Sequence, residues 1–396
     1  MRTAVVVGAG IAGLAAAGAL ARGGWRVTLL ERAERIRPEP TALVLWPNGL
    51  RALRALGLGA GLDAIATTLP AIGVRRPDGQ WLVPPRPAAA DHAPVAVRGE
   101  DLYDLLIAGL GEQVEIRTGF EVRQVRAEEG ERPAVGDGRH QLEADLVVAA
   151  DGIDSVVRSA LVPTSTVVNS GCTAWRAVIP WYRAPRLADD QPVTGETLGA
   201  GYRFVSAPLG ERGSSAKGGI YWVATAAGAP RPEPPATQLA LLRRWFDGWP
   251  APIGELLAAT EPGDLVQQEI RELRPLPRRY GFPAGPGGVV LIGDAAHAMP
   301  HHLGQGAGLA CEDAVTLGSV LREAHLGPAL REALESYTRI RRPRTVTIVR
   351  HTRRMAALLR ARGRLALRAR DAVLSAISPR LVGSATAAIV QWHPPS

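Results

Sequence analysis

The sequence predicts an α/β fold, and three observations support that class. The chain opens on a β-branched run, Thr3–Val7, which is followed by a glycine-rich turn and an alanine-rich stretch typical of strand, turn and helix. Two later apolar runs end in Asp151-Gly152 and in Gly293-Asp294, as buried parallel strands do. Between residues 165 and 273, strand-like runs alternate with Gly and Pro turns. The pattern indicates an α/β domain with an inserted strand-rich domain.

Length and composition are those of a globular protein with room for two domains: 396 residues, 46% hydrophobic and 21% charged. Only two cysteines occur, Cys172 and Cys311, which excludes a disulfide framework and favours a cytoplasmic location. The N-terminus imitates an export signal, but the glycine spacing and the following Glu31 argue against one. No apolar run approaches the roughly 18 to 20 residues that span a bilayer. We therefore expect no stable membrane insertion.

A net charge of +8 raises the question of an anionic partner. Of the 46 basic residues only Lys217 is a lysine, and many arginines gather between residues 339 and 370. Apolar residues recur there at helical spacing, which favours a C-terminal helix pair with a solvated basic face. Contact of that face with an anionic partner or a membrane surface remains the alternative. We expect no nucleic-acid partner.

A G-x-G-x-x-G motif, made by Gly8, Gly10 and Gly13, separates the first strand from the first helix. Its glycines allow a tight turn, close approach of the backbone to a pyrophosphate, and close packing of helix on strand. A second strand, residues 25–31, ends in Glu31, where a carboxylate can accept a hydrogen bond from a ribose hydroxyl. Arg32 follows as a further cofactor-binding candidate. Together these features predict a dinucleotide site, with phosphates at the helix N-terminus.

The segment after the second strand bears on whether that dinucleotide is FAD or NAD. Residues 41–59, TALVLWPNGLRALRALGLG, predict a loop and then a helix. Residues 71–83, AIGVRRPDGQWLV, predict a hairpin around Asp78-Gly79. This interruption of the strand and helix series favours a composite FAD-binding domain over a simple nicotinamide domain.

Two further motifs complete a family resemblance. LEADLVVAADGIDSVVRSAL, residues 142–161, is an apolar strand followed by a helix, and GGVVLIGDAAHAMP, residues 287–300, is another such strand. With the glycine motif they resemble the triple signature of the single-component FAD-dependent monooxygenases, the family of para-hydroxybenzoate hydroxylase and salicylate hydroxylase. The resemblance covers nearly the whole chain in order, including AVRGEDLYDLLI at residues 96–107.

The resemblance implies a Rossmann-like FAD-binding domain of the glutathione-reductase type, with an inserted antiparallel β-sheet substrate domain and C-terminal helices. It also implies that NADPH or NADH visits transiently to reduce FAD. O₂ then yields a flavin C4a-hydroperoxide that transfers one oxygen atom to an electron-rich small molecule. An aromatic or polycyclic substrate from specialised biosynthesis fits this chemistry. The flavin supplies the difficult chemical step, while the protein positions the substrate and excludes water.

The same resemblance assigns cofactor contacts. Asp294 would bond the ribityl chain of FAD, Arg98 would lie along the cofactor, and Val122 would meet the adenine through its backbone. Asp151-Gly152 belongs to a motif linked with both FAD and NAD(P)H. Arg158, on the following helix, is either part of that motif or a structural partner of Asp151.

The loop at residues 293–308 returns to the same cofactor from its other end. The residues that let its backbone approach the flavin are Gly304, Gly306, Ala307 and Gly308. A helix begins there, and its N–H groups stabilise negative charge on reduced flavin. Glu312 and Asp313 are expected to be structural members of that helix.

Three histidines lie in this loop. The family usually presents a proline where His301 stands, so His301 and His302 are the catalytic candidates. They would hydrogen-bond substrate, shuttle protons near neutral pH, or face solvent. His297 matches the family motif and is expected to support the residues that contact the cofactor, without contacting it itself. The three histidines lack a spaced carboxylate or cysteine partner, so no metal is predicted.

The inserted domain should supply the substrate pocket. Residues 171–180, 194–209 and 218–227 predict antiparallel strands, and the hairpin at 71–84 would join their sheet over the flavin. A Pro-rich loop, residues 227–238, leads to an outer helix at 239–249. The pocket-lining candidates are Tyr202, Phe204, Tyr221 and Trp222, although strand alternation sends about half of any run away from a pocket. Arg203 either anchors an acidic substrate or faces solvent.

These expectations divide the chain into three parts. Residues 1–70, 98–164 and 274–338 would form a discontinuous FAD-binding domain, residues 71–97 and 165–273 the substrate domain, and residues 339–396 the C-terminal helices. Competing functions remain an FAD-dependent oxidase or reductase without oxygen insertion, a flavin-dependent halogenase, and a flavin-binding regulatory protein. WRAVIP imitates the halogenase motif, but Ala177 replaces its second Trp, and the only lysine is Lys217.

Overall fold

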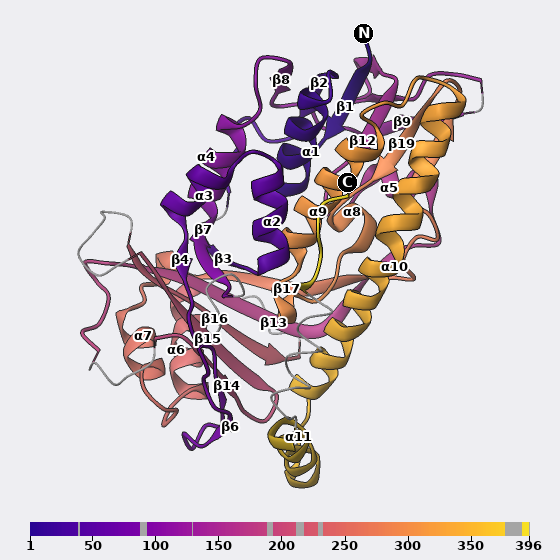
Figure 1. Ribbon diagram of the computed structural model, residues 1–396. Helices are drawn as coiled ribbons and strands as arrows, with labels where there is room; N and C mark the ends of the chain where they lie inside the picture. Colours follow the sequence, from indigo (N-terminus) through magenta and orange to yellow (C-terminus); the bar gives the residue numbers. More distant parts are fainter. Residues whose placement is uncertain are drawn as a thin grey trace.

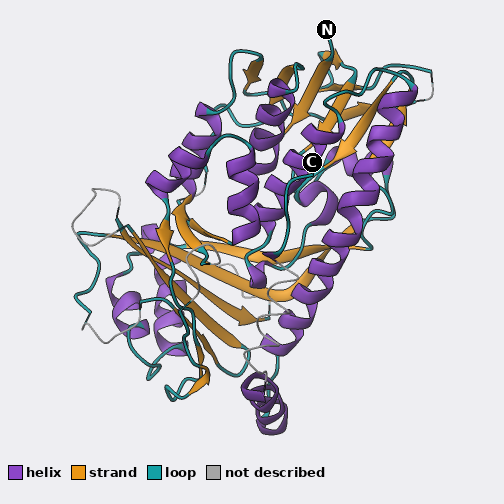
Figure 2. Ribbon diagram, in the orientation of Figure 1, coloured by secondary structure: helices purple, strands orange, loops and turns teal. Residues whose placement is uncertain are grey.

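Two large sheets organise the protein, whose structure is a computed structural model. It describes residues 1–38, 40–87, 93–128, 130–187, 193–210, 218–228, 233–376 and 390–395. One half of the molecule is built on a mainly parallel sheet and the other on a mainly antiparallel sheet (Figures 1 and 2). A long helix, α10 (Pro328–Leu359), runs along both halves. The α/β class with an inserted antiparallel sheet is confirmed.

The parallel sheet has the strand order β18-β19-β12-β1-β2-β8. Its strands are β1 (Thr3–Val7), β2 (Arg26–Leu30), β8 (Val114–Arg117), β12 (Leu146–Ala149), β18 (Gly281–Ala284) and β19 (Gly287–Leu291). Only the β18–β19 pair is antiparallel among these neighbours. The side chains of β1, β12 and β19 are almost wholly buried, as expected for a parallel sheet covered on both faces.

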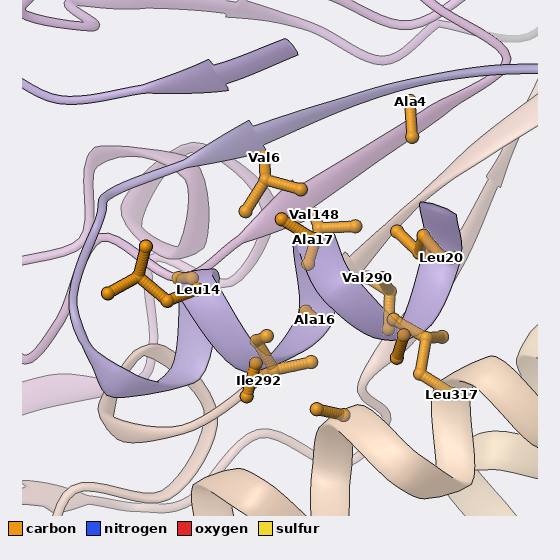
Figure 3. Close-up of a cluster of buried hydrophobic side chains, with 14 of the residues drawn as sticks. Ala4, Val6, Leu14, Ala16, Ala17, Leu20, Val148, Val290, Ile292 and Leu317 are labelled. Carbon is orange, nitrogen blue, oxygen red and sulfur yellow. The ribbon is translucent and has the colours of Figure 1, made fainter. Parts of the chain in front are cut away.

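Two helices pack together on this sheet: α1 (Ile11–Arg22) and α9 (Gly306–Val320). Side chains of both helices meet the strands in one apolar cluster (Figure 3). A Cβ added at Gly293 would lie 2.7 Å from Ala12 and 3.7 Å from Ala310, whereas one added at Gly318 would lie 3.1 Å from Ala19. The helices therefore run side by side in the same direction, and their N-termini lie at the same end. Small residues make this close approach possible.

The remaining elements of this half are short. Helices α2 (Pro47–Ala55), α3 (Gly59–Ile65) and α4 (Gly99–Ala108) adjoin a small sheet of order β3-β7-β4, whose strands are β3 (Ala42–Leu45), β7 (Val95–Arg98) and β4 (Thr67–Thr68). A third sheet combines β11 (Gln141–Glu143), β10 (Ala134–Gly136) and β9 (Gln124–Arg126), and α5 (Val156–Leu161) lies beside β9. The expectation of a loop before α2 was wrong over β3, because this short strand is fixed by pairing with β7 far along the chain.

The antiparallel sheet has the order β17-β13-β16-β15-β14-β5-β6. Its strands are β5 (Val74–Arg75), β6 (Trp81–Val83), β13 (Thr166–Pro180), β14 (Gly195–Leu198), β15 (Tyr202–Leu209), β16 (Gly219–Ala227) and β17 (Val266–Arg274). The predicted hairpin at 71–84 is confirmed as β5 and β6, and it joins the sheet edge through a parallel pairing with β14. Asp78 closes its turn by accepting from the Gln80 N–H at 3.1 Å.

The antiparallel sheet has two distinct faces. Helices α6 (Pro235–Trp245) and α7 (Ile253–Ala259) cover one face, over a cluster that contains Trp175, Phe204 and Trp222. The opposite face carries Tyr221 and Val223 and packs on the small sheet of the other half. A short 3₁₀ turn, Pro262–Asp264, connects α7 to β17. Because side chains alternate, this division decides which residues can meet a cofactor held by the parallel-sheet half.

The C-terminal helix pair is confirmed as α10 and α11 (Arg364–Ala376). Its basic face is only partly solvated, because Arg341 and Arg370 are buried. Helix α10 begins before residue 339, so that expected boundary falls inside a helix. No helix in the described part of the chain is long and apolar enough to cross a membrane. Lys217 and residues 229–232 of the Pro-rich loop lie outside the described residues.

Candidate active site

The glycine turn before α1 is shaped by backbone contacts. Gly8 has φ +98°, and a Cβ there would lie 2.5 Å from the Ala150 carbonyl oxygen. A Cβ at Gly13 would lie 1.8 Å from the Gly8 carbonyl oxygen, so only glycine fits. Gly10, by contrast, caps α1 without a side-chain hydrogen bond, and a Cβ there would meet only Tyr103 Oη at 3.9 Å. There is therefore open space beside Gly10, and the first N–H groups of a helix, which lack partners within the helix, suit a pyrophosphate there.

Glu31 lies against this turn at the end of β2. Its carboxylate oxygens accept from the backbone N–H groups of Ala9 at 2.9 Å and Ala33 at 3.0 Å, and a carboxylate retains further acceptor capacity for a ribose. Arg32 follows it at the surface. The loop that carries the buried Val122 is tied to the same strand end, because the Phe120 N–H donates to the Glu31 carbonyl at 2.9 Å.

The Asp294 loop reaches the same place from β19. Asp294 is the first residue of the short helix α8 (Asp294–His297), which starts beside Ala12 of α1. Its carboxylate has no hydrogen-bond partner among the described residues. Close packing of protein around it raises its pKa, although the side chain still reaches solvent. An acceptor oriented beside the pyrophosphate turn suits a polyol hydroxyl.

A buried charge network holds this loop in place. Asp313 of α9 accepts from the Gly293 N–H at 2.8 Å, pairs with His297 Nε2 at 2.6 Å, and pairs with Arg341 Nε at 2.7 Å. Glu312 pairs with Arg341 Nη1 at 2.7 Å. Burial by itself would raise the pKa of Asp313, but His297 and Arg341 outweigh it and lower that pKa to about 2. The network joins loop, α9 and α10, which fits the expected structural role of Glu312 and Asp313.

Asn48 extends the network to α2. Its Nδ2 donates to Glu312 Oε1 at 2.7 Å and to Gln305 Oε1 at 3.0 Å. A Cβ at Gly308 would lie 3.2 Å from the same Asn48 atom, so helix packing also accounts for that glycine. A Cβ at Gly306 would meet nothing within 4 Å, and Ala307 beside it is only partly buried. The start of α9 therefore offers open backbone next to α2.

The two histidines before α9 contrast with this network. His301 and His302 form a 3₁₀ turn with Leu303, and their ring centroids are 5.0 Å apart. Both ring nitrogens of His302 and the Nε2 of His301 are buried without hydrogen-bond partners among the described residues. Burial and the nearby arginines, Arg203 and Arg360, lower the pKa of His302 to about 3. Burial, followed by Arg176, His302 and Arg203, lowers the pKa of His301 well below its ordinary value.

Both imidazoles are therefore neutral near neutral pH. A neutral ring offers one donor and one acceptor, which suits hydrogen bonding to a ligand. Proton shuttling near neutral pH requires a pKa close to that pH, whereas burial lowers the pKa of both histidines, so the structure favours hydrogen bonding to a ligand among the expected roles. The His302 side chain does not face solvent, because only 4% of the residue is exposed.

On the face opposite α6 and α7, the antiparallel sheet carries mostly small and apolar side chains, together with Tyr221, Arg176 and Arg203, and Arg203 reaches the histidine turn. Arg203 is buried and pairs through two nitrogens with Glu196, at 2.7 and 3.1 Å, and it donates to the His302 carbonyl at 3.3 Å. It therefore does not lie on a solvated face. Tyr221, a pocket candidate from the sequence, lies on this face within the field of both arginines.

The other three pocket candidates lie elsewhere. Phe204 and Trp222 stack with ring centroids 5.3 Å apart under α6 and α7, and Tyr202 meets Phe246 at 6.0 Å on that same side. Strand alternation directs them away from the histidine turn. The expectation that they line the pocket is therefore at odds with the structure, and only Tyr221 of the four has a suitable position.

Asp151-Gly152 lies where β12 ends. Asp151 Oδ2 accepts from the Val156 N–H at 2.9 Å at the start of α5, whose N-cap is Ser155. Asp151 Oδ1 is buried without a partner among the described residues. Burial raises the Asp151 pKa. Arg158 is buried, and the structure shows no direct ion pair between it and Asp151 within the described chain; their interaction acts through space. A Cβ at Gly152 would meet nothing within 4 Å, so backbone there is accessible.

Arg98 lies between the two halves at the start of α4. Its Nη2 donates to the Gly218 carbonyl at 3.1 Å, before β16. A cavity of about 210 Å³ beside it is lined by Pro40, Thr41, Arg98, Glu100, Val178, Pro180, Tyr182, Arg183, Gly263 and Asp264. This charged cavity is smaller than the roughly 300 to 1,000 Å³ of typical ligand sites. Its lining includes neither the histidine turn nor Arg176.

Several site residues escaped the sequence analysis. Asn48, Arg341 and Glu196 carried no motif that marked them, and Arg176 was met only within WRAVIP without a role of its own, because their importance depends on contacts between distant segments. The run WPN was a usable signal, since an asparagine that starts a helix in an apolar stretch needs polar partners. Among the described residues the structure forms no group of three or more His, Cys, Asp or Glu side chains that could hold a metal.

Comparison with known proteins agrees with this geometry. The family model described as "FAD binding domain" matches residues 1–189 and 259–352. Aurachin C monooxygenase/isomerase of Stigmatella aurantiaca is 30% identical over 99% of this chain and 98% of its own. 2-Heptyl-3-hydroxy-4(1H)-quinolone synthase of Pseudomonas aeruginosa is 35% identical over 80% of this chain and 79% of its own.

Solved structures share the fold as well. The structure of Klebsiella pneumoniae HpxO complexed with FAD and uric acid has a TM-score of 0.84 at 25% sequence identity, and the match covers 98% of this chain and 96% of that one. The match spans both sheets, so the inserted antiparallel sheet belongs to the shared architecture.

Proposed function

The chain belongs to the FAD-binding-domain family of flavin-dependent monooxygenases, and on this premise we propose what it acts on and how its residues take part. The proposed reaction inserts one oxygen atom from O₂ into an electron-rich aromatic or heteroaromatic small molecule, with NADH or NADPH as reductant. Relatives named for a quinolone product, for urate and for an aminohydroxybenzoate support this substrate class.

One observation carries the proposal: the N-termini of α1 and α9 lie at the same end of the molecule. Neither helix has a side-chain cap, and Gly10 and Gly306 leave their backbone open. An extended anionic cofactor can therefore place its pyrophosphate at one helix end and its ring system at the other. FAD has this shape and charge, and the open acceptors Glu31 and Asp294 fit its ribose and ribityl hydroxyls.

The chain has three tasks toward such a cofactor. The α1 N-terminus and Glu31 bind the adenosine diphosphate end, with Arg32, Val122 and Gly152 near it. Asp294 orients the ribityl chain, and the N–H groups from Gly306 to Gly308 stabilise negative charge on the ring edge. Bound FAD, once reduced by NAD(P)H, supplies the activation of O₂ that no amino-acid side chain provides.

The substrate would lie between the histidine turn and the antiparallel sheet. There Tyr221 and the neutral His301 can hydrogen-bond it, while the apolar side chains of the sheet exclude water. The Arg203–Glu196 pair fixes the turn through the His302 carbonyl. We propose His301 as a substrate-orienting residue rather than a general acid or base, because its imidazolium is disfavoured.

The division of labour follows from these placements. We propose that residues 1–70, 98–164 and 274–338 hold FAD, that 71–97 and 165–273 cover the substrate, and that α10 joins both parts. NAD(P)H would approach transiently, and the open backbone at Gly152 and the neighbourhood of Arg98 are where we expect it to bind.

The test uses purified protein loaded with FAD. NADH and NADPH oxidation would be followed with O₂ and a panel that contains a 4-quinolone, urate and 3-amino-4-hydroxybenzoate. We expect at least one compound to accelerate NAD(P)H oxidation and to yield a product with one additional oxygen atom. Acceleration that gives only hydrogen peroxide and unchanged compound across the panel would contradict oxygen insertion and favour an oxidase.

A further inference from the structure

Helix α11 is fixed to the edge of the antiparallel sheet by one of its faces. Leu374 is buried in a cluster with Leu82 of β6 and Leu198 of β14. Arg370 is buried as well, and its Nη1 donates to the Gly199 carbonyl at 2.6 Å. Residues 370 and 374 are about one helical turn apart and therefore share a face. The opposite face of α11 points away from the sheet.

That opposite face is apolar and exposed. Leu365 is 80% exposed, the largest fraction among the large apolar side chains of the described residues, and Val373 is 53% exposed. The alanines on the same face are exposed too: Ala366, Ala369, Ala372 and Ala376. At 3.6 residues per turn these six side chains fall within an arc of about 120°, so they form one continuous surface, the α11 stripe.

Positive charge borders the α11 stripe. Arg364 and Arg368 are exposed along one side of it, and neither forms an ion pair with a described residue. Asp371 is the only acid among residues 336–376, which include twelve arginines, and it is already paired with Arg370 at 2.7 Å. Helix α11 therefore combines exposed apolar surface with charge that no acid balances.

The position of α11 lets a broad surface reach it. The helix projects beyond the antiparallel sheet at the end of the molecule opposite the N-terminus (Figure 1). Contacts of Arg370 and Leu374 hold it there, so the α11 stripe keeps its outward direction. A partner can meet this stripe without displacing α11 from the sheet.

We propose that α11 is a docking site for an anionic lipid surface. The α11 stripe enters the boundary between headgroups and acyl chains, while Arg364 and Arg368 pair with lipid phosphates. The protein lies on the membrane and does not cross it. The inference is independent of the reaction, because none of these residues belongs to the candidate active site.

Two other occupants fit this surface less well. A second copy of the chain would bring its own Arg364 and Arg368 to the same face, without an acid to balance the added charge. A nucleic acid would match the charge but would offer the α11 stripe no apolar environment. An anionic lipid surface supplies both the negative charge and the apolar interior.

The experiment measures binding of the FAD-loaded protein to vesicles by co-sedimentation. One set of vesicles is phosphatidylcholine, and the other is an equal mixture of phosphatidylcholine and phosphatidylglycerol, both at about 0.1 M salt. The α11 variants are Leu365→Ser and Arg368→Gln. Their matched controls are Leu326→Ser and Arg331→Gln, at exposed positions beside the other end of α10.

We expect wild type to bind the anionic vesicles at least about 10-fold more tightly than the neutral ones, and about 1 M salt to remove most of that difference. Leu365→Ser should weaken binding to the anionic vesicles about 10-fold and Arg368→Gln about 5-fold. Both controls should bind as wild type does. Absence of binding, equal binding to the two vesicle types, or equal losses in variants and controls would each overturn the proposal.

Two further readouts locate the contact and exclude self-association. An environment-sensitive fluorophore on Ala369→Cys should emit at shorter wavelength when anionic vesicles are added, and labelling is selective because Cys172 and Cys311 are buried. An unchanged emission would contradict entry of the α11 stripe into lipid. Light scattering without vesicles should give one mass for wild type and Leu365→Ser. A dimer that Leu365→Ser dissociates would assign the stripe to a second copy and overturn lipid docking.

Discussion

The loop from Gly293 to Gly308 contains two polar regions that differ in how their polar groups are satisfied. Around His297, every buried carboxylate is paired: Glu312 with Arg341, Arg344 and Asn48, and Asp313 with His297 and Arg341. Two atoms of this region, His297 Nδ1 and Asn48 Oδ1, are buried without a partner among the described residues, but neither carries a formal charge. Around His301 and His302, three buried ring nitrogens have no partner among the described residues. A satisfied buried network rigidifies a fold, whereas unsatisfied polar groups in a cleft are free to bind a ligand.

The difference teaches which histidines to regard as structural. His297 belongs to the family motif and is fully buried, yet its bond to Asp313 commits it to the loop. His301 and His302 lie only a few residues later, and their neighbours keep them neutral and open to a ligand. Sequence proximity alone does not separate these roles.

The largest expected effect comes from breaking the satisfied region. Arg341→Met leaves Glu312 and Asp313 buried with a reduced counter-charge, so the free energy of unfolding should fall by about 3 to 5 kcal/mol. Urea unfolding of the FAD-free protein measures it. Arg339→Met, at an exposed position on the same helix, should change little. An equal loss of unfolding free energy in both variants would contradict a particular contribution of the network to stability.

A direct comparison of the two histidine environments should give an intermediate effect. His297→Leu removes a hydrogen bond to a buried carboxylate and should cost about 1.5 to 3 kcal/mol. His302→Leu removes no hydrogen bond among the described residues and should cost less than about 1 kcal/mol, since it replaces an unsatisfied group with an apolar one. Thermal unfolding ranks the two. The reverse order would contradict the comparison.

Acid should weaken the satisfied region through Asp313. Its pKa is lowered from 3.8 to about 2 in the folded protein. The stabilisation is therefore complete above about pH 4 and is lost as pH falls toward about 2, with a magnitude of about 2 kcal/mol. Unfolding measured between these pH values should show a steeper loss in wild type than in Asp313→Asn. Parallel curves for both proteins would exclude this contribution.

The smallest expected effect is that His302 does not titrate near neutral pH. Because burial and nearby arginines lower the pKa of His302 to about 3, its imidazole should stay neutral from about pH 8 to about pH 5, where an ordinary histidine titrates. NMR of the ring C–H protons follows this directly. A His302 midpoint between about pH 5 and about pH 8 would remove the basis for its neutral role.

The sequence was most informative where local chemistry decides structure. The glycine turn, β1, α1 and the hairpin of β5 and β6 were predicted because backbone sterics and turn residues leave short-range signals. Asp294 and Glu31 were placed beside α1 by motif spacing, and the structure brings both there. Their contacts with FAD remain a proposal.

Other features depend on distant contacts and left no such signal. Strand β3 exists because β7 pairs with it, and Asn48 matters because α9 passes beside it. The sequence also left open which face of a strand each pocket candidate occupies. A shift of one residue in strand register reverses the face on which Phe204 and Trp222 lie. The ion pair of Arg203 likewise became visible only when Glu196 was placed.

The measurement that tests the central claim most directly is isotope labelling. The FAD-loaded protein, NADH or NADPH and the accelerating compound would be incubated under ¹⁸O₂, and the product analysed by mass spectrometry. A monooxygenase should yield a product that carries one ¹⁸O atom, in an amount that tracks NAD(P)H consumed. A product without the label, accompanied by hydrogen peroxide equal to the NAD(P)H consumed, would contradict the account.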